Sequence, residues 1–366
     1  MKFFASKFIH DESKKMWLDF RKEVVSKPQY WICLMFLTVL AYFFDMTNRT
    51  VGLDDLSRPI FIGEGNAMLA GTRWGKTLWI RLLSNCEYAP FIDKYLALFF
   101  LLISAVLFSK LVYTWFRLSN HKLLLCTVFS CLFVTFPLIN EVWVYNDSNV
   151  VTYGNMVIVA ACVLLLYNSN KYFSKRMIVT AFLLSIVVSS YESVGFVYIS
   201  VVISILLMDY LFLSRKRWIE NGIRYAIPLI IAVVLRYVIG FSIISILHLQ
   251  YHPNGAVEIQ WRITEDLIPQ IIHLMSDILN LYFARGLIHY PITVIFITFL
   301  LGLVWSIVKT VRRKDGTILL LFILLGFSLF LQAFIQGTVM PYRTAQPLQY
   351  FRETLIISQL FTNNRG

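Results

Sequence analysis

The sequence contains repeated runs of about 20 mostly apolar residues, separated by short polar segments. A run of this length is what an α-helix needs to cross the hydrocarbon core of a bilayer. The runs do not alternate apolar and polar residues, as a half-buried β-strand would. Hydrophobic residues make up 58% of the chain and charged residues only 15%, which excludes an ordinary soluble domain. The chain is therefore predicted to be an all-α polytopic membrane protein.

About nine to ten transmembrane helices are predicted from the apolar runs. Nine of them lie at residues 30–44, 95–116, 123–139, 155–167, 177–190, 194–213, 225–247, 290–308 and 317–335. The fifth and sixth can alternatively form one long hairpin broken near Ser190. A tenth segment, at residues 348–360, is short for a span.

Lysine and arginine are distributed unevenly over the predicted loops. Most of the 33 fall in alternate loops that begin with the N-terminal segment, and the opposite loops carry about half as many. Cytoplasmic loops carry the positive excess, so the N-terminus is predicted to be cytoplasmic and the long loops at 46–94 and 248–289 external. Membrane orientation accounts for the net charge of +12, which therefore does not indicate nucleic-acid binding.

Two parts of unequal size are predicted. In residues 1–28, Met16, Phe20 and Val24 recur at helical spacing among charged residues, as in an amphipathic helix on the cytoplasmic surface of a membrane. This polar stretch is too long for the start of a cleavable signal peptide, so the first apolar run is expected to stay as an anchor. Residues 29–366 are predicted to form a single transmembrane domain.

The first external loop contains a weak match to a nucleotide-binding loop, in which Ala70 is followed after four positions by Gly-Lys-Thr. No strand-like run precedes it, and the predicted topology places it on the side of the membrane where ATP is not ordinarily present. ATP binding is therefore not expected. From Gly75 onward, Leu78, Trp79 and Leu82 share one arc of a helix, which predicts an interfacial or re-entrant helix.

Adjacent carboxylates, Asp54 and Asp55, lie just beyond the first predicted membrane helix, close to Arg58. Gly52 and Pro59 flank them and indicate a shaped turn. A carboxylate at a membrane rim can act as a general base when burial and neighbouring charges raise its pKa. One of the two is predicted to be that base, with the other orienting a basic group or a metal, although solvated loop acids are an equally ordinary pattern.

Further charged residues lie at or near the same outer side. Arg236, midway along the seventh run, requires a partner such as Glu192 or a phosphate, because a central arginine costs about 2.5 to 3.5 kcal/mol. Arg343 follows the ninth run and can contact a phosphate or simply reach the headgroups. In the loop 140–155, Glu141 and Asp147 are candidate acceptor-sugar contacts, whereas its aromatic residues suit an interfacial belt.

Four short motifs occur in this order: NRTVGLDDLSRP (48–59), GTRWGK (71–76), YES (191–193) and MPYRTAQPLQYF (340–351). Together with their predicted sidedness they resemble the bacterial GtrII family of membrane glucosyltransferases. The resemblance implies a GT-C-like fold in a bacterial inner membrane with a periplasmic active site. It also implies transfer of glucose from a polyprenyl-phosphate carrier to a surface polysaccharide such as O antigen, with inversion at the anomeric carbon.

The resemblance extends to individual residues. It implies catalytic roles for Asp54 and Asp55, donor-phosphate contacts by Arg73 and Arg343, and sugar or acceptor contacts by Trp74, Tyr191 and Glu192. Their own positions and charges add Arg58 and Arg236 as predicted donor-phosphate contacts, and Glu141 and Asp147 as predicted acceptor contacts. Glu192 stands where the resemblance leads us to expect glutamine. Similar proteins normally continue with further apolar segments, so the chain is expected to be a shortened form whose own activity is a separate question.

Two alternatives of other classes remain open from the sequence, namely a transporter or flippase for lipid-linked sugars and a non-catalytic lipid-binding subunit. A transporter would place its site near the bilayer midplane, within repeated halves that this sequence does not show. His248 and His252 lack the further ligands of a zinc site, so no metal ligand is predicted. The implied mechanism leaves open a divalent cation at the leaving phosphate. The five cysteines do not form a disulfide framework.

Overall fold

The computed structural model describes residues 14–47, 64–84, 90–135, 146–167, 174–212, 217–251, 267–283, 289–328 and 331. These parts are almost entirely helical and contain no strand, which confirms the predicted all-α class. The helices are α2 (Pro28–Thr47), α4 (Glu64–Ala70), α5 (Trp74–Ser84), α6 (Pro90–Phe116), α7 (Lys122–Val134), α9 (Asn146–Tyr167), α10 (Lys175–Ser190), α11 (Glu192–Phe212), α12 (Trp218–Ile246), α13 (Leu267–Phe283), α14 (His289–Arg313) and α15 (Thr317–Ser328).

Length and apolar composition qualify four helices within the described residues as membrane spans, in α6, α9, α11 and α12. A fifth is added if the helix Lys14–Val25 and the segment Pro28–Phe44, bent by 67°, form one broken span. Helices α7 and α15 are apolar but shorter. Membrane embedding is thus supported, whereas nine to ten spans and a GT-C fold stay predictions.

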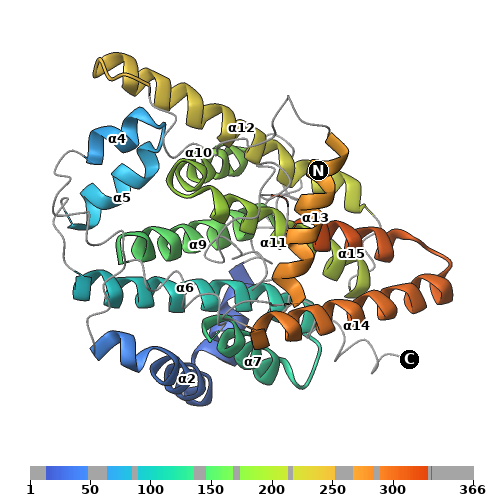
Figure 1. Cartoon of the computed structure of the whole chain (residues 1–366). Coiled ribbons are helices and arrows are strands. Elements are labelled where there is room, and N and C mark those ends of the chain that lie inside the picture. Colours follow the sequence, from blue (N-terminus) through green and yellow to red (C-terminus); the bar gives the residue numbers. More distant parts are fainter. Residues whose placement is uncertain are drawn as a thin grey trace, which may run out of the picture.

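Helix α11 lies at the centre of the bundle, and nearly all of its side chains are buried (Figure 1). Around it, α6 packs extensively against α9, and α10 against α12. The carboxylate of Asp209 in α11 accepts hydrogen bonds from Trp115 Nε1 at 2.9 Å and Tyr167 Oη at 2.8 Å. These bonds satisfy a polar group that would otherwise be costly in an apolar interior.

The outer helices expose rows of large apolar side chains. Helix α12 exposes Ile230, Val234 and Val238 at helical spacing, and α2 exposes Phe36 and Leu40. Continuous apolar surfaces of this kind are unfavourable in water and mark contact with a membrane or a partner. Since both helices also have the length or composition of spans, acyl chains are the fitting environment for these faces.

Ion pairs join the N-terminal helix to the connection between α6 and α7. Arg117 Nη2 lies 2.9 Å from Asp19 Oδ2, and Lys122 Nζ lies 2.8 Å from Glu23 Oε2. Phe20 and Val24 are buried in the protein's apolar core, so this stripe of the helix packs against the bundle. The structure thus brings together two basic segments that the charge distribution assigns to the same side of the membrane.

Two local predictions about this part of the chain need correction. Helix α9 begins at Asn146, so the second half of the predicted loop 140–155 is helical, and Tyr153 is fully buried rather than part of an interfacial belt. Trp79 does not share a membrane-facing surface with Leu78 and Leu82: its indole donates to Asn155 Oδ1 at 2.9 Å, while both leucines are exposed. Sequence periodicity could not distinguish a lipid-facing ring from one packed on a neighbouring helix.

Candidate functional site

The connection between α4 and α5 places a sharp turn beside α10 and α12. Thr72 N donates to the Leu69 carbonyl at 3.0 Å and Arg73 N to the Met68 carbonyl at 2.9 Å, which ends α4. Thr72 has a φ of 60°, an unfavourable left-handed conformation for a β-branched residue. Because α4 rather than a strand precedes the turn, the segment lacks the frame of a nucleotide-binding loop.

The four residues 72–75, here called the clip segment, contact three different helices. Thr72 packs closely on α12: a Cβ added at Gly240 would lie 2.8 Å from the Cβ of Thr72. Trp74 Nε1 donates to the Arg236 carbonyl, also in α12, at 3.3 Å. Such tight contacts leave the turn little freedom, so the surrounding helices hold its strained backbone in place.

Gly75 gives the clip segment its closest approach to α10. A Cβ at this position would lie 2.4 Å from the Ile186 carbonyl oxygen and from Ser189 Oγ, and 2.5 Å from Ser190 Oγ. Glycine is therefore the residue that lets the start of α5 lie against the last turn of α10. Directly after that turn, a single residue in extended conformation, Tyr191, separates α10 from α11.

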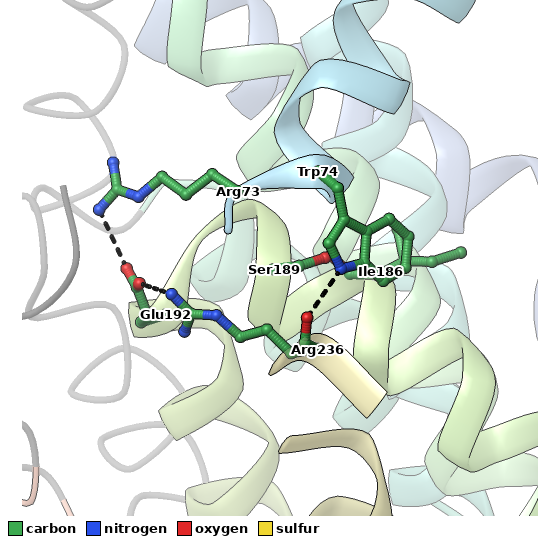
Figure 2. A network of polar contacts seen from close by, with 6 residues as sticks. All are labelled: Arg73, Trp74, Ile186, Ser189, Glu192 and Arg236. Atoms are coloured by element: carbon green, nitrogen blue, oxygen red, sulfur yellow. Dashed lines mark hydrogen bonds and ion pairs between the residues drawn. The ribbon is translucent and has the colours of Figure 1, made fainter. Parts of the chain in front are cut away.

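Three charged side chains meet where these helices converge, and they are called the triad here: Arg73, Glu192 and Arg236 (Figure 2). Glu192 Oε1 lies 2.6 Å from Arg236 Nη2, and Glu192 Oε2 lies 3.2 Å from Arg73 Nη2. The side chains of Arg236, Glu192 and Arg73 are 6%, 12% and 26% exposed. Glu192 is the first residue of α11, where a negative charge also interacts favourably with the helix dipole.

Several buried polar atoms of the triad and its immediate neighbours have no hydrogen-bond partner among the described residues. They are Arg73 Nε, Arg236 Nε, Thr72 Oγ1, Thr77 Oγ1 and Ser193 Oγ. Native structures rarely leave such atoms unsatisfied, so an unpaired group calls for a ligand, an ion or water. All five atoms can donate a hydrogen bond, and guanidinium groups suit phosphate and carboxylate oxygens.

Two arginines and one glutamate give the triad a formal net charge of +1. Unsatisfied N–H and O–H groups surround this charge beside the junction of α10 and α11. The arrangement can bind an anion through charge-assisted hydrogen bonds, and it can stabilise negative charge that develops on a leaving group. The described residues contain no group of three or more His, Cys, Asp or Glu side chains placed to hold a metal ion.

The structure brings together several of the site residues that the sequence suggested. Arg73, Trp74, Glu192 and Arg236 form one network, and Tyr191 directly precedes Glu192. Of the two partners considered for Arg236, Glu192 is the one it contacts. Asp147 lies in the first turn of α9, and its side chain is outside the described part of the structure. Asp54, Asp55, Arg58, Glu141 and Arg343 lie outside the described residues.

Sequence reasoning missed the small residues that make the network possible. Thr72, Gly75 and Gly240 attracted no functional prediction, although each lies at a close helix contact. One signal was present in the sequence: Gly240 follows Arg236 by four positions, so both lie on the same face of α12. A glycine one turn from a buried arginine indicates that another backbone approaches there.

Comparison with known proteins gives one match. A family model described as glucosyl transferase GtrII matches residues 42–361, a range that includes the triad and the clip segment. No curated protein and no solved structure matches the chain.

Proposed function

The chain belongs to the GtrII glucosyl transferase family, and from this premise we propose that it moves a glucosyl residue from a polyprenyl-phosphate-linked donor to a surface polysaccharide such as O antigen. Membership makes the chain a glucosyltransferase. The lipid-linked donor, the polysaccharide acceptor and a periplasmic reaction in the bacterial inner membrane belong to the proposal.

The triad is the observation that carries this proposal. A polyprenyl tail must remain among acyl chains while its sugar phosphate stays at the polar surface, so the enzyme needs a cationic group at the end of an apolar bundle. Arg73 and Arg236 are proposed to provide this group: their guanidinium groups lie beside the junction of α10 and α11, and unpaired donor atoms surround them. We assign them to the phosphate of the sugar donor.

The proposed chemistry is a single displacement at the anomeric carbon. Asp54 or Asp55 accepts the proton of the acceptor hydroxyl as its oxygen forms the new glycosidic bond. The bond between the anomeric carbon and the phosphate oxygen breaks at the same time, and its electron pair leaves with polyprenyl phosphate. Arg73 and Arg236 stabilise the charge on that phosphate, and the configuration of the sugar is inverted. Arg58 and Arg343 are proposed as further phosphate contacts.

The sugar and the acceptor are assigned to aromatic and acidic side chains. Trp74 and Tyr191 offer aromatic faces, and Glu141, Asp147 and Glu192 offer carboxylates for sugar hydroxyls. Because Glu192 is engaged by two arginines, we place it at the phosphate end of the donor rather than at the acceptor.

A cell-based assay tests the proposal. Cells supplied with polyprenyl-phosphate-glucose express the chain or a variant, and glucose on the surface polysaccharide is measured. We expect Arg73→Ala to abolish glucosylation. Arg81→Ala is expected to preserve it, because Arg81 lies in the helix that follows Arg73, α5, and its side chain is exposed. Asp54→Asn or Asp55→Asn is expected to abolish it as well. Full glucosylation by both Asn variants would remove these residues as bases.

Purified protein in sealed vesicles distinguishes the enzyme from a transporter. We expect radiolabelled glucose to enter a glycosidic bond with added acceptor. Movement of labelled lipid-linked sugar across the vesicle membrane, without bond formation, would instead identify a flippase.

A further inference from the structure

The two ion pairs of Glu192 differ in length and burial. The pair with Arg236 is 2.6 Å long and the arginine is 6% exposed, whereas the pair with Arg73 is 3.2 Å long and that arginine is 26% exposed. A short, buried, charge-assisted bond is the stronger of the two. The Arg73 pair is therefore the one that a competing anion can displace.

The backbone that carries Arg236 is also held more firmly than the backbone that carries Arg73. Arg236 lies within α12, and its backbone carbonyl is bound by the Trp74 indole. Arg73 lies on the turn before α5, and its guanidinium extends from the clip segment towards Glu192 (Figure 2). Only Arg73 can thus exchange its partner without disturbing the middle of a long helix.

A phosphate that binds Arg73 through Nη2, the guanidinium nitrogen that now faces Glu192, takes the place held by Glu192 Oε2. Both groups carry negative charge, and both are best bound by the same guanidinium edge. Juxtaposed like charges are strongly unfavourable, so Glu192 weakens the binding of any phosphate at this position. The same carboxylate prevents the two guanidinium groups from facing one another unpaired.

We propose that Glu192 is a resident counterion that holds Arg73 in position, releases it to the donor phosphate while staying bound to Arg236, and recovers it when polyprenyl phosphate leaves. Glu192 is in this sense a positioning residue that promotes product release. The inference rests on the proposed function, because it requires a lipid-linked phosphate at the triad.

Glu192→Gln provides the direct test, since it preserves the side-chain size and a hydrogen-bonding oxygen for Arg236 but removes the charge. The full-length protein in nanodiscs of zwitterionic lipid is titrated with polyprenyl phosphate, and turnover is measured in the same preparation. We expect Glu192→Gln to bind polyprenyl phosphate about tenfold more tightly and to have a lower kcat, because product release is slowed. Glu192→Asp, which keeps the charge, should retain an affinity near wild type.

A matched control is Asp19→Asn, which removes the carboxylate of the Arg117 ion pair in another part of the molecule and should leave affinity and kcat unchanged. Unchanged or weaker phosphate binding by Glu192→Gln would overturn the inference. If the wild-type protein neither binds polyprenyl phosphate nor forms a glycosidic bond, the proposed function itself fails, and this is seen before any variant is compared.

A second variant decides the matter if Glu192→Gln does not fold. Arg73→Gln should weaken polyprenyl phosphate binding about tenfold while the protein keeps its thermal unfolding midpoint, because the buried pair of Glu192 with Arg236 remains. Unfolding of Arg73→Gln, or unchanged phosphate binding, would contradict the exchange.

Discussion

Gly75→Ala tests whether the clip segment positions the triad. The added Cβ would lie 2.4 Å from the Ile186 carbonyl oxygen, whereas an ordinary carbon–oxygen contact is about 3.4 Å. The carbonyl belongs to the backbone of α10 and cannot rotate away, so the start of α5 must move by about 1 Å. This displacement carries Arg73 and Trp74 away from Glu192 and α12.

Two effects are expected from this movement, one on stability and one on the reaction rate. Overpacking of a tight contact reduces the free energy of unfolding by about 1 to 3 kcal/mol. A misplacement of about 1 Å in a binding group can reduce the reaction rate by about a hundredfold. A hundredfold loss of rate corresponds to about 2.7 kcal/mol, which is similar to the loss of stability. A membrane protein with a free energy of unfolding of about 5 to 15 kcal/mol stays mostly folded after such a loss. Gly75→Ala is therefore expected to fold but to lose most of its glucosyltransferase activity.

The assay measures glucosyl transfer and thermal unfolding on the same purified protein in nanodiscs. Gly316→Ala is the matched control, because the turn between α14 and α15 leaves a Cβ no neighbour within 4 Å. Adding Ser189→Ala to Gly75→Ala removes one of the close oxygen atoms and should restore part of the activity. Turnover of Gly75→Ala at the wild-type rate would refute the assignment of the clip segment as a positioning element.

Three further predictions follow from the charged groups. Arg236→Leu should lower the free energy of unfolding, measured by chemical unfolding, by about 3 to 5 kcal/mol, because it leaves Glu192 buried with only its longer ion pair. Changing both Glu192 and Arg236 to leucine should recover most of this loss. Hydrogen bonds from Lys122 and Tyr113, together with the charge of Lys122, lower the pKa of Glu23. The ion pair of Glu23 therefore stabilises the N-terminal helix fully above the usual carboxyl pKa of 4.5, and this stabilisation is lost as the pH falls through the lowered pKa. Proteolysis of that helix should therefore increase in acid, and the protection lost should be less than about 1 kcal/mol because the pair is partly exposed. Lys122→Met should reduce this pH dependence, while the hydrogen bond from Tyr113 and the charge of Arg117 maintain part of it. With the native accessible cysteines replaced, a membrane-impermeant thiol reagent applied to spheroplasts should label Arg73→Cys and spare Lys122→Cys, and the reverse pattern would overturn the proposed orientation.

The sequence was sufficient to predict which segments are helices but not which neighbours they contact. Apolar runs located α2, α6, α10, α11, α12 and α14, because a membrane helix must satisfy its backbone internally and therefore requires a long apolar stretch. The first turns of α9 were missed, since Asn149, Thr152 and Asn155 are buried polar residues that hydropathy assigns to a loop. Their burial depends on packing against other helices, which local composition does not encode.

The candidate site was predicted in part for a similar reason. An arginine within an apolar run must have a partner, so Arg236 could be identified from the sequence, and Glu192 was one of two partners considered. The identity of that partner depends on where α11 begins relative to α12, which is a tertiary property. The role of Gly75 depends on an interhelical distance, and glycine in an amphipathic helix carries no such information by itself.

The charges of the triad are difficult to explain by stability alone. A central arginine in a membrane helix costs about 2.5 to 3.5 kcal/mol, and a buried ion pair can often be replaced by apolar residues without loss of stability. Glu192 and Arg236 lie among apolar helices where leucine would pack, yet the clip segment adds a second arginine through a strained turn at Thr72. Strain and buried charge at one place are characteristic of a binding site. If this reasoning holds, the double leucine variant of Glu192 and Arg236 should fold like the wild-type protein and transfer no glucose, whereas retained transfer would show that the triad is only structural.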